Sequence, residues 1–237
     1  MFSGADLWIG MAGTVVLWAV SGALAVLFGL ALAAASDSPR ERLRMVGRAL
    51  VNLTRGIPTS LFVIAGGLGM MRLAATPDLP TIFPGTSPGF QHVAWGVTLA
   101  LALGSAGHLA EIFRAARAAL GRHRLEQAAV LGLSPLRRGV LVAHECAAIA
   151  VPPAGARLIH HLHNTAFAAL FPMADLFGAV QAQASATFRV FYFGLLGCAI
   201  YVALSMLIWI ATRIIEAAVA PPQPVPTEPA QTERVLA

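Results

Sequence analysis

The chain has 237 residues, of which 57% are hydrophobic and only 11% are charged. A soluble globular domain carries about 25% charged residues, so the composition argues against a soluble enzyme. The formal net charge is +5, but every basic residue is Arg and the Arg side chains cluster between apolar blocks. That pattern orients a membrane protein, and we expect no nucleic-acid partner.

Five apolar blocks follow one another along the chain. Each is long enough for a helix that crosses a bilayer, which needs about 20 apolar residues. We place the five spans at about 7–35, 49–73, 92–113, 150–172 and 190–213. The second span contains a local break at 54–58, and Pro172 and Asp175 interrupt the segment after the fourth. The Pro-rich tail, 221–237, is expected to be disordered.

The distribution of Arg predicts the topology. The Arg-rich segments 36–48 and 114–145 fall on one side of a five-span protein, and the Arg-free segment 74–91 falls on the other. The positive-inside rule makes the Arg-rich side cytoplasmic. We therefore expect an all-α, polytopic membrane protein with its N-terminus outside and its C-terminus in the cytoplasm.

The segment 114–145 reads as two helices joined by a tight turn. Gly132 suits the left-handed conformation at a helix end. Ser134 suits the N-cap of the next helix and Pro135 its first position. The first arm has an apolar face at helical spacing, and two interpretations stay open: an element that docks on a partner, or a helix that lies at the lipid headgroups.

The stretch AEIFRAARAALGRHRLEQAAVLGLSPLRR resembles the permease subunits of bacterial ABC importers for polar amino acids. Further similarities are Thr54–Pro58 at the second span, Pro152-Pro153 at the opening of the fourth, His163-Asn164-Thr165, Asp175-Leu176 and Phe188-Arg189. Together they cover about 12–215. The stretch 142–145 lacks a Pro that the family usually has, and His163-Asn164 stands where Lys-Asp is common, so the solute stays open.

The resemblance implies that 1–220 is a permease domain of the bacterial inner membrane, surrounded by lipid, which provides the path for a polar amino acid or a similar small solute. The implied partners are ABC ATPase subunits, a second permease (the same chain or a paralogue) and a periplasmic solute-binding protein. ATP and Mg would be held by the ATPase. This chain would bind no cofactor and would not be an enzyme, and it has no GxxxxGK(S/T) stretch for a nucleotide. Within the loop 114–145, the residues implied to couple to the ATPase are Gly121, Glu126, Gln127, Ala128, Leu131, Gly132, Leu133 and Ser134.

Polar side chains at membrane depth usually face a cavity or a partner. Candidates for the translocation path are His160, His163, Asn164 and Thr165. On a helix, His160, His163 and Asn164 share one face, and His161 points about 100° away from His160. Packing between subunits is the alternative for this set, and no metal site is expected. Arg55, Glu111, Arg157 and Arg189 are candidates for anchors or ion pairs, with Arg55 and Glu111 as one such pair.

Two other functions remain as alternatives. One is a membrane scaffold subunit without transport activity. The other is an intramembrane enzyme, but the Ser residues lie in no GxSxG turn, and Ala148 stands where an HExxH motif that begins at His144 needs its second His.

Overall fold

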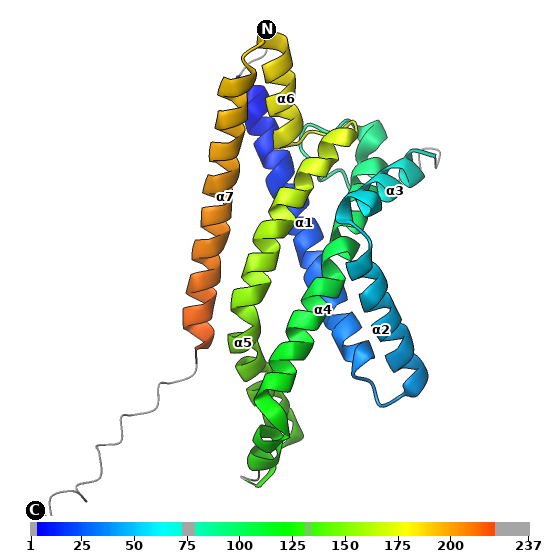
Figure 1. Cartoon of the computed structure of the whole chain (residues 1–237), viewed down its shortest axis with the longest axis vertical. Coiled ribbons are helices and arrows are strands. Elements are labelled where there is room, and N and C mark those ends of the chain that lie inside the picture. Colours follow the sequence, from blue (N-terminus) through cyan, green and yellow to red (C-terminus); the bar gives the residue numbers. More distant parts are fainter. Residues whose placement is uncertain (1–3, 73–78, 131, 133, 221–237) are drawn as a thin grey trace, which may run out of the picture.

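The computed structural model describes residues 4–72, 79–130, 132 and 134–220, and every regular element in these ranges is helical (Figure 1). The elements are α1 (Gly4–Ser36), α2 (Glu41–Gly56), α3 (Thr59–Arg72), η1 (Pro88–Phe90), α4 (Gln91–Val130), α5 (Pro135–Asn164), η2 (Thr165–Leu170), α6 (Leu176–Thr187) and α7 (Val190–Val219). The all-α prediction is confirmed.

Helix α4 is the centre of the bundle. Helices α1, α2, α3 and α5 all pack against it. In its most apolar 18-residue window, 78% of the residues are buried, against 28% for α1 and 11% for α5 and α7. The main core lies where Val97 and Leu101 of α4 meet Leu17 of α1, Val63 of α3 and Phe171.

The outer surface is apolar. Large side chains such as Phe191 and Leu195 are exposed on α7, at 86% and 62%. Water does not favour such a surface, whereas hydrocarbon does. Within the described ranges, four helices are long and apolar enough to cross a membrane. The chain is a multi-pass membrane protein.

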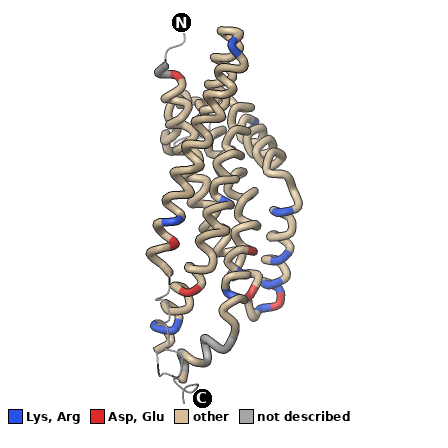
Figure 2. Tube along the Cα trace, turned by 60° about the vertical axis from the view of Figure 1, so that its left-hand side comes forward, with Lys and Arg blue, Asp and Glu red and all other residues tan. Residues whose placement is uncertain are grey.

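The two ends of the bundle differ in charge. The α1–α2 turn, the α4–α5 turn and the end of α7 lie at one end, and the start of α1, η1 and α6 lie at the other (Figure 1). Most of the charged positions gather over the first of these ends (Figure 2). This arrangement follows the alternation predicted from the Arg distribution, and the side of the membrane stays a prediction.

The second predicted span differs from the structure. We expected it at 49–73, but α2 already begins at Glu41, so most of the Arg-rich segment 36–48 is helical. Helices α2 and α3 meet at 97°. Pro58 has no N–H to donate and disfavours the helical conformation of Ile57, whose φ and ψ are −96° and 128°. The bent pair counts as a fifth span only if both helices together cross the membrane.

The helix of the fourth predicted span begins before the expected start of that span. Helix α5 runs from Pro135 through Pro152 and Pro153, so the diproline lies inside this helix, and the point at which the span begins stays a prediction. After η2, the side chain of Asp175 accepts a hydrogen bond from the Gly178 N–H and caps α6. This short helix occupies the interrupted segment before the last span.

Candidate functional site

A sharp corner joins α4 to α5 at the charged end of the bundle. Gly121 has φ 65° and ψ 167°, a conformation almost confined to glycine. Gly132 has φ 69°, and the Ser134 hydroxyl accepts a hydrogen bond from the Arg137 N–H at 3.4 Å. Pro135 occupies the first turn of α5. The predicted helix, glycine turn and capped helix are confirmed, and Gly121 adds a second bend.

The residues predicted to couple to an ATPase lie on this corner. The backbone of Glu126, Gln127 and Ala128 is helical in the last part of α4, and the Gln127 side chain is exposed. Leu131 and Leu133 lie outside the described residues. Their role in coupling stays a prediction.

A buried histidine joins three helices. His161 of α5 is 0% exposed. Its Nε2 lies 2.7 Å from the Oγ of Ser21 on α1, and its Nδ1 lies 2.8 Å from the Oγ of Ser105 on α4. We call Ser21, His161 and Ser105 the Ser–His–Ser bridge.

The direction of each hydrogen bond in the bridge follows from the donors available. Ser21 donates its only hydroxyl hydrogen to the Leu17 carbonyl, so it accepts from Nε2–H of His161. Nδ1 is then an acceptor and receives the Ser105 hydroxyl hydrogen. Ser105 in turn accepts from Nη2 of Arg157 at 3.1 Å. A series of hydrogen bonds therefore connects Arg157 to Ser21 of α1 through a neutral imidazole.

Arg157 belongs to a second group, which we call the basic patch: Arg55, His108, Arg157 and His160. Nη2 of Arg157 also donates to the Gly104 carbonyl at 3.0 Å, one turn before His108 on α4. A Cβ at Gly107 would lie 3.1 Å from Cγ of Arg55, so this side chain lies against α4 at the residue before His108. His160 follows Arg157 by three residues on α5.

The predicted path residues divide between two sides of α5. The Asn164 amide lies 3.3 Å from Nδ1 of His160. The Nε2 of His163, however, lies 3.1 Å from the Oγ of Ser205 on α7. Thr165 is buried and donates to the Leu162 carbonyl. His160 and Asn164 thus contact each other, whereas His163 contacts α7, and the role of these residues in the path stays a prediction.

The predicted anchors have different partners from those expected. Nη1 of Arg114 pairs with Glu111 at 2.8 Å and Nε of Arg114 pairs with Asp37 at 3.0 Å. Glu111 thus bonds to Arg114 and not, as one alternative had it, to Arg55. Arg189 is exposed and precedes α7, with its N–H donating to the Thr187 hydroxyl.

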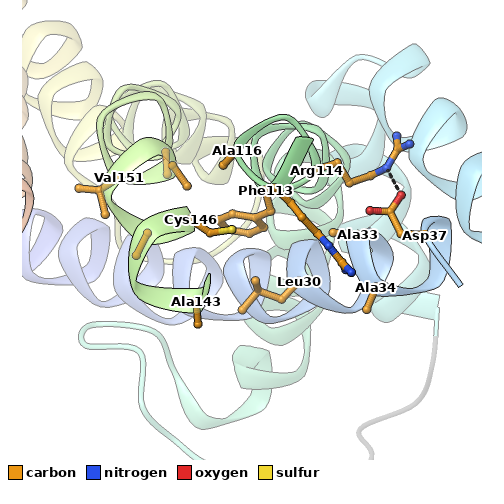
Figure 3. A pocket seen from close by; sticks show the side chains of 14 residues that line it. Leu30, Ala33, Ala34, Asp37, Phe113, Arg114, Ala116, Ala143, Cys146 and Val151 are labelled. Atoms are coloured by element: carbon orange, nitrogen blue, oxygen red, sulfur yellow. Dashed lines mark hydrogen bonds and ion pairs between the residues drawn. The ribbon is translucent and has the colours of Figure 1, made fainter. Parts of the chain in front are cut away.

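Two cavities of about 380 Å³ each open on the bundle. The first lies between α1, α4 and α5, with Phe113 beside Cys146 and the Arg114–Asp37 pair at its edge (Figure 3). The second lies between α5, α6 and α7 and is lined by His163 and Tyr201. Of the predicted path residues, His163 alone lines either cavity.

The Ser–His–Ser bridge gives the enzyme alternative no support. The two serine–histidine contacts place each ring nitrogen of a fully buried imidazole against a hydroxyl, so neither nitrogen is left to act as a base on a bound substrate. Among the described residues, no three His, Cys, Asp or Glu side chains converge as metal ligands would.

Sequence reasoning missed the Ser–His–Ser bridge and the Asp37–Arg114–Glu111 cluster. Helical periodicity separates His161 from His160, but it does not say which face packs on which helix. Ser21 lies 140 residues from His161 in sequence, so no local pattern could join them.

Comparisons with known proteins agree with the fold. No protein-family model matches the chain. The probable amino-acid permease protein YxeN of Bacillus subtilis (strain 168) is 27% identical over 195 residues, which are 80% of this chain and 77% of the relative.

Two solved structures are similar along most of their length. A chain in the crystal structure of an amino acid ABC transporter with histidines has a TM-score of 0.73 at 21% identity, covering 90% of this chain and 94% of that one. A chain of the inward-facing MetNI methionine ABC transporter has a TM-score of 0.71 at 18% identity, covering 93% and 100%. The resemblance inferred from the sequence is confirmed: this chain is similar to a probable amino-acid permease and has the fold of chains from an amino acid and a methionine ABC transporter.

Proposed function

We propose that this chain is a membrane-spanning subunit of an ABC importer and provides the translocation path for a polar amino acid or a similar small solute. ATP hydrolysis in a partner subunit drives the transport. The observation that carries the proposal is the fold, which matches an amino acid ABC transporter chain over 90% of this chain and 94% of that one.

The proposed partners are ABC ATPase subunits, a second permease subunit and a periplasmic solute-binding protein. ATP and Mg belong to the ATPase in this proposal. The charged end of the bundle faces the cytoplasm of a bacterium, across its inner membrane, and the start of α1 faces outside. The corner between α4 and α5 is then the contact with the ATPase.

The corner is well placed to transmit movement. Helix α5 begins in the corner at Ser134 and continues without a loop to Arg157 and His160. At 1.5 Å per residue this arm is about 35 Å long. Both glycines of the corner hold conformations in which other residues are strained, so the corner has a defined shape. A displacement of the corner by the ATPase therefore moves the basic patch through one continuous helix.

Co-purification tests the proposal. The tagged full-length chain, extracted in mild detergent from its own cells, is expected to bring down an ABC ATPase that mass spectrometry identifies. Deletion of Gly121–Gly132 should abolish that association, and deletion of 221–237 serves as the control and should preserve it. An ATPase that stays bound after the first deletion would contradict the role of the corner, and no ATPase with the intact chain would contradict the function.

A further inference from the structure

The basic patch contains four basic side chains from three helices. Arg55 comes from α2, His108 from α4, and Arg157 and His160 from α5. Arg55 and His160 are exposed, and His108 and Arg157 are half-buried. The permanent positive charges of the patch are the guanidinium groups of Arg55 and Arg157. The patch is therefore an accessible surface with a positive field.

Nearby carboxylates in the described part of the chain do not neutralise this field. Glu111 follows His108 by one turn, but its Oε1 lies 2.8 Å from Nη1 of Arg114. Asp37 lies 3.0 Å from Nε of the same Arg114. Both carboxylates are thus already paired with Arg114, which lies outside the patch.

Hydrogen bonds to α4 hold the Arg157 guanidinium in place without using all of its N–H donors. Both described hydrogen bonds of its guanidinium come from Nη2, to Gly104 and Ser105. Its Nε is buried and has no hydrogen-bond partner among the described residues. A guanidinium has five N–H donors in a fixed fork that suits a carboxylate. The bonds to α4 fix the fork, and no described hydrogen bond uses Nη1, which leaves this nitrogen to donate to a ligand.

His108, Arg157 and His160 lie within candidate membrane spans. The guanidinium of Arg157 is costly at that depth unless it faces a cavity or meets a counter-charge. We propose that the basic patch is a carboxylate site on the solute path, and that the solute is a small amino acid with a net negative charge. The inference rests on the proposed function and adds the charge class of the solute.

The charge of the patch decides between classes of solute. Every amino acid has one carboxylate, which Arg157 can bind. A second carboxylate is attracted by Arg55, whereas a basic side chain meets the like charges of Arg55 and Arg157. An amide side chain gains polar contacts but no ionic attraction. Acidic solutes should therefore bind more tightly than amides, and amides more tightly than basic solutes.

Binding to the full-length chain in lipid nanodiscs tests this order. The probes are L-glutamate, L-glutamine and L-lysine at equal ionic strength and pH 7, followed by saturation-transfer NMR and calorimetry. Glutamate and glutamine have nearly the same shape and differ by one charge. Glutamine lacks the charge-assisted hydrogen bonds of the second carboxylate, so it should bind about tenfold more weakly than glutamate. Lysine should bind more weakly still.

Variants connect the preference to the patch. Arg157→Gln should remove most of the difference between glutamate and glutamine, and Arg157→Lys should keep part of it, because the charge remains without the fork. Substitution of Arg157 also removes its hydrogen bonds to α4. Arg55→Gln is therefore the second test, because the Arg55 side chain is exposed and its substitution leaves those bonds intact. Arg189→Gln, which lies outside the patch, should change nothing.

The outcomes separate this inference from the proposed function. Equal or tighter binding of lysine, binding of none of the three probes, or a preference that survives both Arg157→Gln and Arg55→Gln would overturn the carboxylate site. If an ABC ATPase still co-purifies in that case, the importer stands and only the charge class fails. If glutamate binds as expected but no ATPase co-purifies, the importer fails and the anion site remains.

Discussion

Nε2 of His161 lies 2.7 Å from Oγ of Ser21, across the contact between α5 and α1. With Ser105 on the other ring nitrogen, the imidazole connects three helices at a point with no access to solvent. Each donor in this chain has one acceptor, so the bridge fixes a single arrangement of α1, α4 and α5. The same Ser105 positions Arg157, and the bridge thereby supports the basic patch.

Removal of the Ser21 hydroxyl should destabilise the chain. Ser21→Ala leaves Nε2–H of His161 buried without its acceptor. Hydrogen bonds between membrane helices contribute about 0.6 kcal/mol on average and up to about 1.7 kcal/mol, and we expect a loss in the upper half of that range. Thermal unfolding of the detergent-purified chain measures it. In an His161→Ala background the same substitution should cost much less, so equal costs in both backgrounds would contradict a bond between the two side chains.

The sequence predicts the corner between α4 and α5, but it does not predict the Ser–His–Ser bridge. Gly132, Ser134 and Pro135 act within one turn of the chain, so cap chemistry predicts the corner without tertiary information. The break at Pro58 is local for the same reason. His161 is different, because its partners come from α1 and α4, and helical periodicity gives relative directions without a neighbour.

Helix α2 shows a second limit. Its start at Glu41 lies in an Arg-rich segment that hydropathy assigns to a loop, yet Gly47 and Val51 are buried against the rest of the bundle. One face of this helix packs and the other carries the charges. A window that averages hydropathy removes that difference, so the helix begins eight residues before the expected span.

Gly67 should be intolerant of a larger side chain. A Cβ at this position would clash with the ring of Phe171, which is 7% exposed and part of the main core. Because the ring has little room to move, Gly67→Ala should cost about 1–3 kcal/mol. Gly69 lies on the same helix with nothing within 4 Å of its Cβ position, so Gly69→Ala should be neutral or stabilise α3 by up to about 1 kcal/mol. Similar melting temperatures for both variants would contradict the contact between α3 and Phe171.

Asp175 should make the stability of the folded chain depend on pH. Burial raises the pKa of its carboxyl from 3.8 to about 6, against the smaller opposing effect of the Gly178 and Phe177 N–H groups. As pH rises from about 4 through 6, the unfolded chain releases this proton first, so this residue's contribution to stability falls and then levels off. Asp175→Asn retains a capping side chain and should flatten that fall. The melting temperature of the variant relative to the original chain should therefore increase between pH 4.5 and 7, and a constant difference would contradict a raised pKa.

Asp175→Ala separates capping from charge. It removes both the carboxyl and the acceptor for the Gly178 N–H, which lies 3.0 Å from Oδ1. Loss of an N-cap costs about 1 kcal/mol, so this variant should be less stable than Asp175→Asn at every pH. If both variants behave alike, the side chain does not cap α6.

The glycines of the corner should be needed for its shape. Gly121 and Gly132 have φ of 65° and 69°, and neither has a neighbour within 4 Å of its Cβ position. Substitution by Ala therefore meets no clash with the described residues, and its cost of about 1–3 kcal/mol comes from the positive-φ backbone alone. Gly139 lies in α5 with equally open surroundings and without positive φ, which makes Gly139→Ala the matched control. Under the proposed function, Gly121→Ala and Gly132→Ala should reduce solute-stimulated ATPase activity of the reconstituted transporter several-fold, whereas Gly139→Ala should retain it. Equal activity in all three variants would show that the corner does not transmit movement through its shape.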